Sequence, residues 1–356
     1  MKFRGVVYDV GLRFVPGQPY SVEPFDPALV KHDIRVIAKD LHATAVRIEG
    51  EEIDRLVTAS RFAHAEGLTV FFNPWKMGAH IDELPAYYAQ GARAAEQLRK
   101  EGVDIIFVAG CETPLFNKGI FPGEQLTDRL GWLTRQFAES GLQSGEIPAE
   151  FAGKWPTLNQ MLSASVKAVP AEFLGRVTYA ATAFEDVDWR IFDIVGVDYY
   201  RHGESAEKYI AGLNRFRNDK PLVVMEVGSC AYLGAAALGA GGFMVLEGVN
   251  PDGTGKFKGG VVPTRSEREQ ANYVGEVLEL LDKGGVDGAF IFVFSFLTYR
   301  FGEGASDLDM ISFSLVKTFP EIDPQSKAMP PWMPKEAFVR VAEFNKRYGA
   351  GAAGSS

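Results

Sequence analysis

The feature that most constrains this chain of 356 residues is a regular alternation of short apolar, β-branched runs with longer segments of helical period. Eight such runs occur, and each is followed by a helical segment or turn. Eight strand–helix units in order, with no long structureless linker, predict a single (β/α)8 TIM barrel of the α/β class. The expected strands are 6–9, 43–48, 69–73, 104–110, 177–181, 194–200, 222–226 and 289–294.

Helical periodicity and glycines at the expected helix ends predict which segments between these strands are helices. Gly67 and Gly102 stand where two of the helices are expected to end. An open doubly wound sheet is disfavoured, because no Gly-rich nucleotide loop follows an early strand. We therefore expect one barrel domain, 1–348, and a flexible tail of Gly, Ala and Ser, 349–356. The expected helical segments are 26–40, 51–67, 82–101, at least two within 122–173, a turn near Trp189, 205–217, 266–283 and 335–347.

Composition excludes several classes of function. The net charge is −9 and no basic stripe occurs, so nucleic acid is not an expected partner. Two cysteines are too few for a disulfide framework or a zinc site, and the five histidines lack metal-ligand spacing. We expect no metal and no organic cofactor. No apolar run is long enough to cross a bilayer and no leader peptide precedes the first strand, so a cytoplasmic protein without a membrane partner is expected.

Polar residues at the strand ends carry the functional argument, because chemistry in such barrels lies at the carboxyl ends of the strands. Glu112 follows the fourth strand and Glu226 closes the seventh. A carboxylate at the end of a fully apolar strand is costly to desolvate unless it is paired or used. The two strands lie across the barrel mouth, where the carboxyls could stand about 5 Å apart. The other polar residues at strand ends are Asp9, Arg47, Asn73, Asp198, Tyr199, Tyr200 and Ser295.

On these residues the chain resembles the large clan (clan A) of retaining glycoside hydrolases that are built on this barrel. The resemblance implies that Glu112 is the acid/base and Glu226 the nucleophile. It implies that Arg47 hydrogen-bonds the nucleophile and keeps it ionised. Tyr199 or Tyr200 matches the aromatic residue of the sixth strand beside the nucleophile. Adjacent residues of a strand face opposite sides, so we expect only one of the two tyrosines to point into the site.

The resemblance has two departures. Cys111 stands where the clan has the Asn that holds the sugar 2-hydroxyl, and Phe294 is assigned to the place of the Trp that forms the sugar floor. Asn73 is a candidate for reaching the hydroxyl instead, Trp75 is a candidate stacking platform, and Asp9 completes the expected substrate-binding set. At whole-chain level the sequence also resembles actinobacterial proteins that are labelled abortive infection proteins.

Together these features predict a retaining glycoside hydrolase that acts on an oligosaccharide or glycoside by double displacement. The alternative is a carbohydrate-binding or phage-defence barrel without catalysis, in which the same carboxylates accept hydrogen bonds. Saccharide binding without turnover favours that alternative. Two structural alternatives also stay open: Arg47 could pair with Asp9 or Glu49 as part of the barrel, and Asn73 could form an ordinary turn with Pro74.

Overall fold

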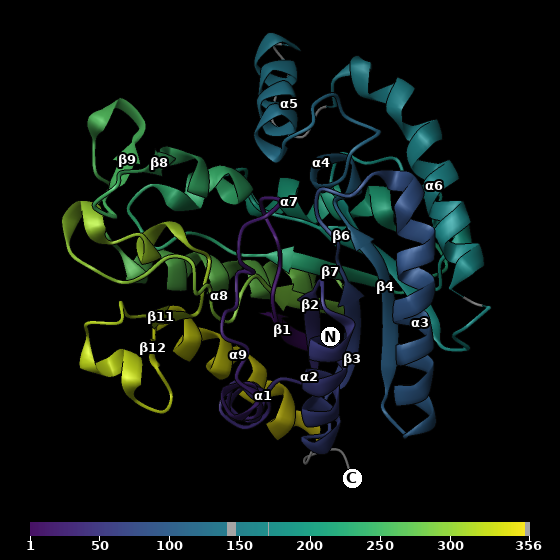
Figure 1. Cartoon of the computed structure of the whole chain (residues 1–356), viewed down its shortest axis with the longest axis horizontal. Helices are drawn as coiled ribbons and strands as arrows, with labels where there is room; N and C mark the ends of the chain where they lie inside the picture. The colour runs from purple at the N-terminus through teal and green to yellow at the C-terminus, as the bar shows by residue number, and fades with distance from the viewer. Residues whose placement is uncertain (141–146, 170, 353–356) are drawn as a thin grey trace.

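The computed structural model describes residues 1–140, 147–169 and 171–352 and contains a closed barrel of parallel strands (Figure 1). Around the barrel the strand order is β1, β10, β7, β6, β5, β4, β3, β2, and every pairing is parallel. This confirms the predicted (β/α)8 fold. The barrel strands are β1 (Phe3–Asp9), β2 (Ala45–Gly50), β3 (Thr69–Pro74), β4 (Ile105–Cys111), β5 (Arg176–Thr182), β6 (Val195–Asp198), β7 (Leu222–Val227) and β10 (Gly288–Ile291).

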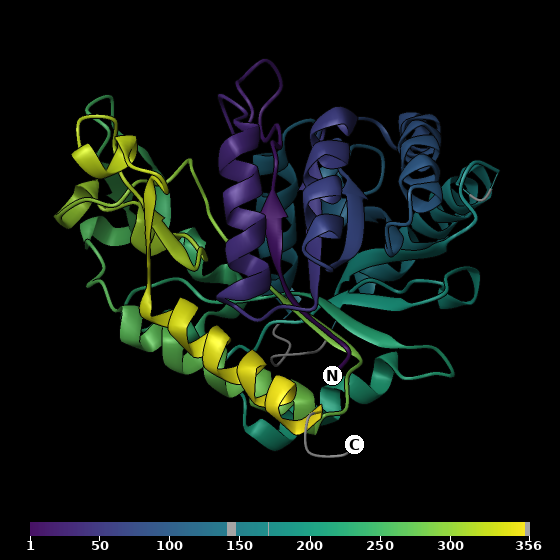
Figure 2. The ribbon, with the colours of Figure 1, turned by 90° about the horizontal axis from the view of Figure 1, so that it is seen from below.

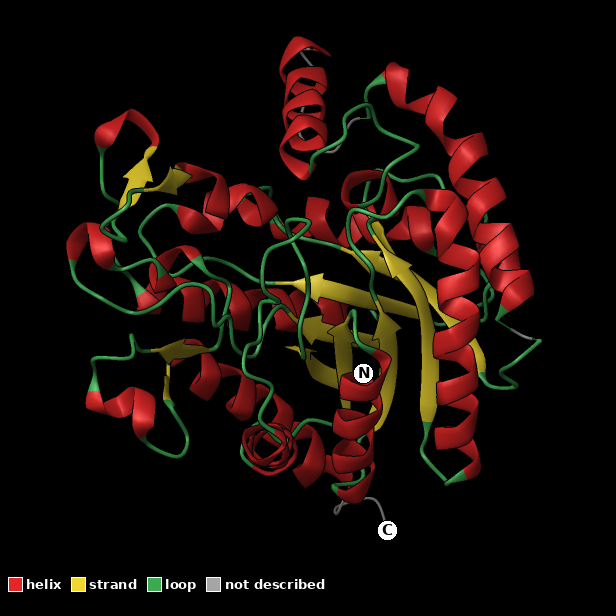
Figure 3. Ribbon diagram, in the orientation of Figure 1, coloured by secondary structure: helices red, strands yellow, loops and turns green. Residues whose placement is uncertain are grey.

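Helices form the outer layer around the strands (Figures 2 and 3). Local sequence sets their ends: the Asp26 carboxylate accepts the N–H of Ala28 at the start of the first helix. Gly67 follows the second with φ of 78°, as its predicted place at the helix end requires. The helices are α1 (Pro27–Lys39), α2 (Ile53–Ala65), α3 (Leu84–Lys100), α4 (Thr113–Phe116), α5 (Leu126–Ser140), α6 (Trp155–Ala168), α7 (Ala206–Gly212), α8 (Glu267–Lys283) and α9 (Glu336–Ala352).

The last helix closes the ring of helices. In Figure 2 α9 runs beside α8, and the side-chain amide of Asn345 donates to the carbonyl of Leu41, 2.8 Å away, after α1. A short 3-10 helix, Trp189–Ile191, forms at the turn predicted near Trp189. No helix in the described ranges has both the length and the apolar character needed to traverse a bilayer.

Two apolar layers hold the barrel together. Successive strand residues alternate between them: Phe71 belongs to the cluster inside the barrel, with Phe3 and Phe290, whereas Phe72 packs outward against Phe107. The strands are buried on both faces, which explains why they read as continuous apolar runs.

Two antiparallel strand pairs outside the barrel were not predicted from the sequence. An antiparallel pair, β8 (Leu246–Val249) and β9 (Gly255–Phe257), lies between β7 and α8, and a second, β11 (Val316–Thr318) and β12 (Trp332–Pro334), precedes α9. These strands are three or four residues long, too short for an alternating pattern to identify. The eighth barrel strand also ends at Ile291, three residues before the predicted end.

The predicted tail, 349–356, is described only in part. Helix α9 runs to Ala352, and residues 353–356 lie outside the described residues. Its flexibility stays a prediction.

Candidate active site

Arg47 and Glu226 form the centre of a polar cluster at the carboxyl ends of the strands. Arg47 is fully buried on β2, and its Nη1 donates to Glu226 Oε1 at 2.9 Å and to the carbonyl of Met225 at 3.1 Å. Its Nε donates to Asn73 Oδ1 at 3.0 Å, and its Nη2 lies 3.2 Å from Glu49 Oε2. Burial acts to lower the pKa of Arg47, but the acidic groups around it raise that pKa overall, so the guanidinium keeps its charge. Arg47 therefore fixes the direction of the Glu226 carboxylate.

Two residues of the β6 end complete the surroundings of Glu226. Asp198 is the register partner of Glu226 across the β6–β7 pair, and its Oδ1 lies 3.8 Å from Arg47 Nη1. The hydroxyl of Tyr200 donates to Glu226 Oε2 at 3.2 Å. Both Glu226 oxygens thus have a hydrogen-bond donor, so the carboxylate is held from two sides.

Glu112 is placed by an unusual backbone conformation. It follows β4 with φ 42° and ψ 44°, in the left-handed region that non-glycine residues seldom occupy. Its N–H donates to the carbonyl of Ala180 on β5 at 2.8 Å, and it forms the N-terminal cap of α4. The next residue is held as well, because the N–H of Thr113 donates to the hydroxyl of Tyr179 at 2.8 Å. The strand end therefore turns sharply at Glu112, whose side chain is half-buried.

Burial and the neighbouring carboxylates both raise the pKa values of Glu112 and Asp198. Burial raises the pKa of Glu112 well above its ordinary value of 4.5, and the charges of Glu226 and then Glu185 raise it further. The pKa of Asp198 is raised well above 3.8 by burial, then by Glu226 and Glu112. A carboxyl group with a raised pKa keeps its proton toward neutral pH and can act as a general acid there.

Cys111 lies among the carboxylates, immediately before Glu112. Its Sγ is 3.5 Å from Glu226 Oε1 and 3.6 Å from Asp198 Oδ2. One ligand atom from each of these three residues lies within 4.8 Å of the others, a spacing that could hold a metal ion. The guanidinium of Arg47, 2.9 Å from Glu226, already supplies positive charge at this place. A cation would therefore compete with Arg47 for the same oxygen.

We expect both cysteines to resist alkylation in the folded protein. Cys111 and Cys230 are fully buried, and burial raises the pKa of each thiol, so little thiolate forms. Incubation with iodoacetamide at pH 8, followed by intact mass spectrometry, should show no adduct before denaturation and two after it. Rapid labelling of the native protein would contradict the buried position of Cys111.

Two of the predicted site residues point elsewhere. Tyr199 turns away from the carboxylates: its hydroxyl donates to the carbonyl of Tyr209 at 2.8 Å and its ring stacks on that of Tyr209. Tyr200 is the tyrosine of the pair that faces Glu226. Phe294 packs between barrel and helices against Tyr8 and Trp332, so it forms no floor to the site. The regular alternation ends with β10 at Ile291, and for this reason strand spacing does not predict the direction of Phe294.

Three other predicted substrate-binding residues already have protein partners. Asp9 accepts from the N–H of Gly11 at 2.7 Å and from the Ser21 hydroxyl, and burial raises the pKa of Asp9 to about 6. Asn73 is fully buried and holds Arg47, so it orients the arginine. Trp75 is only 3% exposed and meets the ring of Phe116 edge-on at 4.9 Å, so neither face of its indole is open.

Two carboxylates near the site were not predicted as site residues. Glu49 follows Arg47 by two residues on β2, and the period of a strand places both side chains inside the barrel; that spacing was a usable signal. Glu185 is buried beyond β5, accepts from the Tyr179 hydroxyl at 2.8 Å, and has a pKa raised by burial to about 7. It lies in a loop, where strand period gives no information. Asp198, predicted only as a polar residue at a strand end, points into the cluster.

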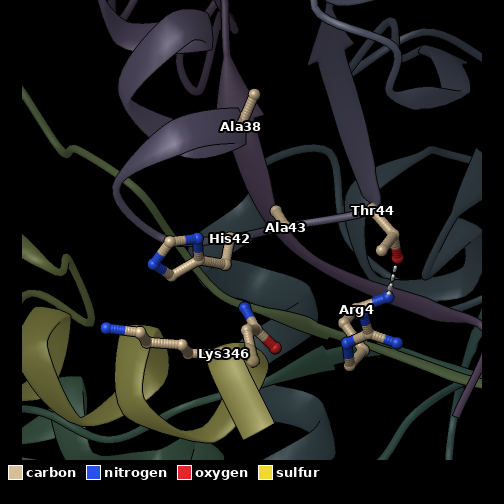
Figure 4. Close-up of a pocket in the computed structure, with 7 residues that line it drawn as sticks. Arg4, Ala38, His42, Ala43, Thr44 and Lys346 are labelled. Atoms are coloured by element: carbon tan, nitrogen blue, oxygen red, sulfur yellow. Dashed lines mark hydrogen bonds between the residues drawn. The ribbon is translucent and has the colours of Figure 1, made fainter. Parts of the chain in front are cut away.

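An open pocket lies at the other end of the barrel (Figure 4). Arg4 and Thr44 line it, with the N–H of Arg4 donating to Thr44 Oγ1 at 3.0 Å, and both stand near the amino ends of their strands. His42 and Lys346, which also line it, are exposed. Because chemistry in this fold occurs at the carboxyl ends, we place this pocket outside the candidate active site.

Comparison with known proteins gives structural matches only. No family model matches the chain, and no curated protein matches it. Among solved structures, a GH113 β-1,4-mannanase matches with 15% identity and a TM-score of 0.59 over 97% of this chain and 99% of that chain. The GH113 β-mannanase of Alicyclobacillus acidocaldarius has 15% identity and a TM-score of 0.54 over 98% of each chain. A β-glucuronidase of Ruminococcus gnavus has 14% identity and a TM-score of 0.54 over 98% of this chain and 49% of that chain. These neighbours are glycoside hydrolases, and at such identities the likeness establishes the shared barrel fold.

Proposed function

We propose that the protein is a retaining glycoside hydrolase in which Glu226 is the nucleophile and Glu112 the acid/base. One observation carries the proposal: Glu226, at the end of β7, is held by Arg47 at 2.9 Å, while burial and Glu226 itself raise the pKa of Glu112 at the end of β4. Two carboxyl groups in different environments are what such a reaction requires. The glycoside hydrolases among the solved structures of the same fold add support.

The reaction assigns one step to each carboxyl group. Glu226 attacks the anomeric carbon and forms a glycosyl–enzyme ester, while the bond to the leaving oxygen breaks and Glu112 gives that oxygen its proton. Glu112, now a carboxylate, takes a proton from water; the water attacks the anomeric carbon and releases the sugar and Glu226. Arg47 and Tyr200 hydrogen-bond Glu226 and hold it in one orientation.

A panel of 4-nitrophenyl glycosides tests the proposal. The solved structures of the same fold include mannanases, a β-glucuronidase and a β-glucosidase, which suggests β-mannosides, β-glucuronides and β-glucosides as the first members. Turnover should release the sugar with its anomeric configuration retained, which proton NMR of the first product shows directly. Inversion would overturn the roles of both glutamates. Saturable sugar binding without turnover on any member of the panel would instead favour the non-catalytic alternative.

We expect activity to fall as the pH rises through the raised pKa of Glu112. The protonated form is the acid, so the rate on glycosides with poor leaving groups is high below this pKa and is lost above it. In Glu112→Gln the alkaline limb of the profile of kcat/KM should disappear. Dinitrophenyl glycosides need little protonation, so formation of the glycosyl–enzyme from them should be reduced far less than from alkyl glycosides. An alkaline limb that persists in Glu112→Gln would assign the limb to another group.

A further inference from the structure

A buried pair of side chains, Tyr179 and Glu185, lies next to the turn at Glu112. Tyr179 is fully buried on β5, and its hydroxyl donates to Glu185 Oε2 at 2.8 Å. The same hydroxyl accepts the N–H of Thr113, the residue after Glu112, at 2.8 Å. One phenol oxygen therefore connects the backbone at the end of β4 to a carboxyl group in the loop after β5.

The carboxyl group of Glu185 is itself held in place. Its Oε1 accepts from the N–H of Thr182 at 2.9 Å and from the Thr182 hydroxyl at 3.0 Å, and Glu185 is 4% exposed. An ionised carboxyl group only accepts hydrogen bonds, so the Tyr179 hydroxyl directs its proton toward Glu185 and an oxygen lone pair toward the N–H of Thr113. Glu185 thereby orients the acceptor that holds the turn.

Two successive residues of β5 hold two successive N–H groups of the turn. The carbonyl of Ala180 accepts the N–H of Glu112 at 2.8 Å, and the hydroxyl of Tyr179 accepts that of Thr113. Ala180 belongs to the apolar cluster inside the barrel, whereas Tyr179 belongs to the layer between strands and helices, where its ring stacks on that of Phe192. Tyr179 therefore reaches the reaction only through the backbone that carries Glu112.

The turn depends on such contacts because its backbone conformation is unfavourable. Glu112 has φ of 42°, and the register of the β4–β5 pair shifts between Val108 and Cys111, directly before it. A residue with a side chain keeps the left-handed conformation only where the surrounding structure enforces it. Without the hydrogen bond to Thr113, we expect the backbone to relax and the Glu112 carboxyl to lose its direction.

Glu185 also acts on Glu112 through its charge. The titratable and charged groups around Glu112 are Arg47 and Glu49 on β2, Cys111 on β4, Glu185 after β5, Asp198 and Tyr200 at the end of β6, and Glu226 on β7. After burial and the charge of Glu226, the charge of Glu185 is the next cause that raises the pKa of Glu112. Burial raises the pKa of Glu185 itself to about 7, so its charge grows as the pH rises through that value.

We propose that Tyr179 and Glu185 are positioning residues for Glu112, which hold its carboxyl group in the direction that proton transfer requires. The inference rests on the proposed function, in which Glu112 is the acid/base. Tyr179 contributes the hydrogen bond that fixes the turn. Glu185 contributes the orientation of the Tyr179 hydroxyl and a negative charge that favours the protonated acid.

Tyr179→Phe tests the hydrogen bond, because it keeps the ring and removes only the hydroxyl. We expect kcat/KM on alkyl glycosides to fall about tenfold or more, out of the roughly 10²–10⁴-fold that acid catalysis contributes. Formation of the glycosyl–enzyme from dinitrophenyl glycosides, which need little protonation, should fall far less. Tyr8→Phe is the matched control, since Tyr8 is a buried tyrosine of β1 whose hydroxyl donates to the buried Asp33 at 3.0 Å, and it should leave the ratio of the two rates unchanged. An equal loss on both substrates in Tyr179→Phe would overturn the positioning role.

Glu185→Gln tests the charge, because glutamine can still accept from Tyr179 but stays neutral. The alkaline limb of kcat/KM on alkyl glycosides should lie at lower pH than in the wild type, since removal of a nearby negative charge lowers the pKa of Glu112. Asp33→Asn is the control: burial raises the pKa of Asp33 to about 7 as well, but Asp33 pairs with Tyr8, and the limb should stay in place. An unmoved limb in Glu185→Gln would refute the contribution of its charge.

A titration distinguishes these outcomes from failure of the proposed function. Carbon-13 NMR of labelled glutamate carboxyls, with Glu112→Gln to assign the signal, measures the pKa of Glu112 without substrate. The midpoint should be lower in Glu185→Gln than in the wild type, and an unchanged midpoint contradicts the role of Glu185 even if no glycoside is turned over. If Glu112→Gln leaves the ratio of the two substrates unchanged, the proposed function fails. If Glu112→Gln changes that ratio and Tyr179→Phe does not, the positioning proposal alone fails.

Discussion

Replacing Glu226 with glutamine is expected to lower kcat/KM on the best aryl glycoside by at least about 10^4-fold, as loss of a nucleophile commonly does. Glutamine has the same shape but cannot form the glycosyl–enzyme ester, and it leaves Arg47 and Tyr200 without their carboxylate partner. Initial rates over a range of substrate concentrations measure the loss. Activity near that of the wild type would remove Glu226 from the reaction.

A smaller side chain at the same position adds a positive test. In Glu226→Ala, azide can enter the space of the lost carboxylate and attack the anomeric carbon in its place. We expect partial recovery of turnover and a glycosyl azide of inverted configuration, identified by NMR. Glu207→Gln serves as a control, since Glu207 lies in the first turn of α7 and is exposed.

Replacing Arg47 with methionine should lower the free energy of unfolding by about 3–5 kcal/mol, the range for a buried ion pair that loses one partner. Methionine keeps an unbranched apolar stem but lacks the guanidinium, so Glu226, Glu49 and Asp198 then share a buried site without the Arg47 charge. Chemical denaturation followed by tryptophan fluorescence measures the difference. Turnover should be lost as well, because Glu226 then loses the hydrogen bond that orients its Oε1.

The pH dependence of the unfolding free energy distinguishes the loss of the Arg47 charge from a simple loss of packing. Burial raises the pKa values of Glu49 and Asp198 in the folded chain, and Arg47 opposes that rise, so without Arg47 both pKa values lie higher still. At a pH below their pKa values in the unfolded chain, these carboxyls are neutral in both states, and their burial then costs little folding free energy. As the pH rises, the carboxyls ionise in the unfolded chain before they ionise in the folded one, so the loss of unfolding free energy grows. The deficit of Arg47→Met should therefore shrink at low pH, whereas Leu56→Ala, a truncation in the apolar core, should show a constant deficit. A deficit in Arg47→Met that does not change with pH would contradict the electrostatic account.

Most of the barrel could be predicted because its strands are buried on both faces. Residues 105–111 are all buried and nearly all apolar, so the run stands out without any alternation. Between such runs, the helices carry caps and terminal glycines that mark their ends. The pairs β8–β9 and β11–β12 gave no such signal, since three or four residues cannot show a period.

The position of polar residues at strand ends predicted the polar cluster correctly only for residues that lie within a regular strand. Arg47 and Glu226 lie within β2 and β7, where alternation fixes the side on which each side chain points. Trp75 and Phe294 lie just past the ends of β3 and β10, where loop packing decides the direction, and both turned into apolar contacts. Asp198 is the last residue of β6, and its partners come from β2, β4 and β7. Only the closed barrel makes these partners neighbours.

The left-handed backbone at Glu112 has a consequence for how this position can change during evolution. With φ at 42°, β-branched side chains are strained there whatever their chemistry, while Asn, Asp and Gly fit the backbone more readily. Two independent constraints thus act on substitutions at position 112: the backbone conformation and, under the proposed function, the need for a carboxyl group that transfers a proton. A mutational scan should show a graded stability loss that follows backbone preference and, separately, a stepwise activity loss at every residue without a carboxyl. Lineages that lose catalysis would be expected to keep the turn and to exchange Glu112 first for asparagine, aspartate or glycine.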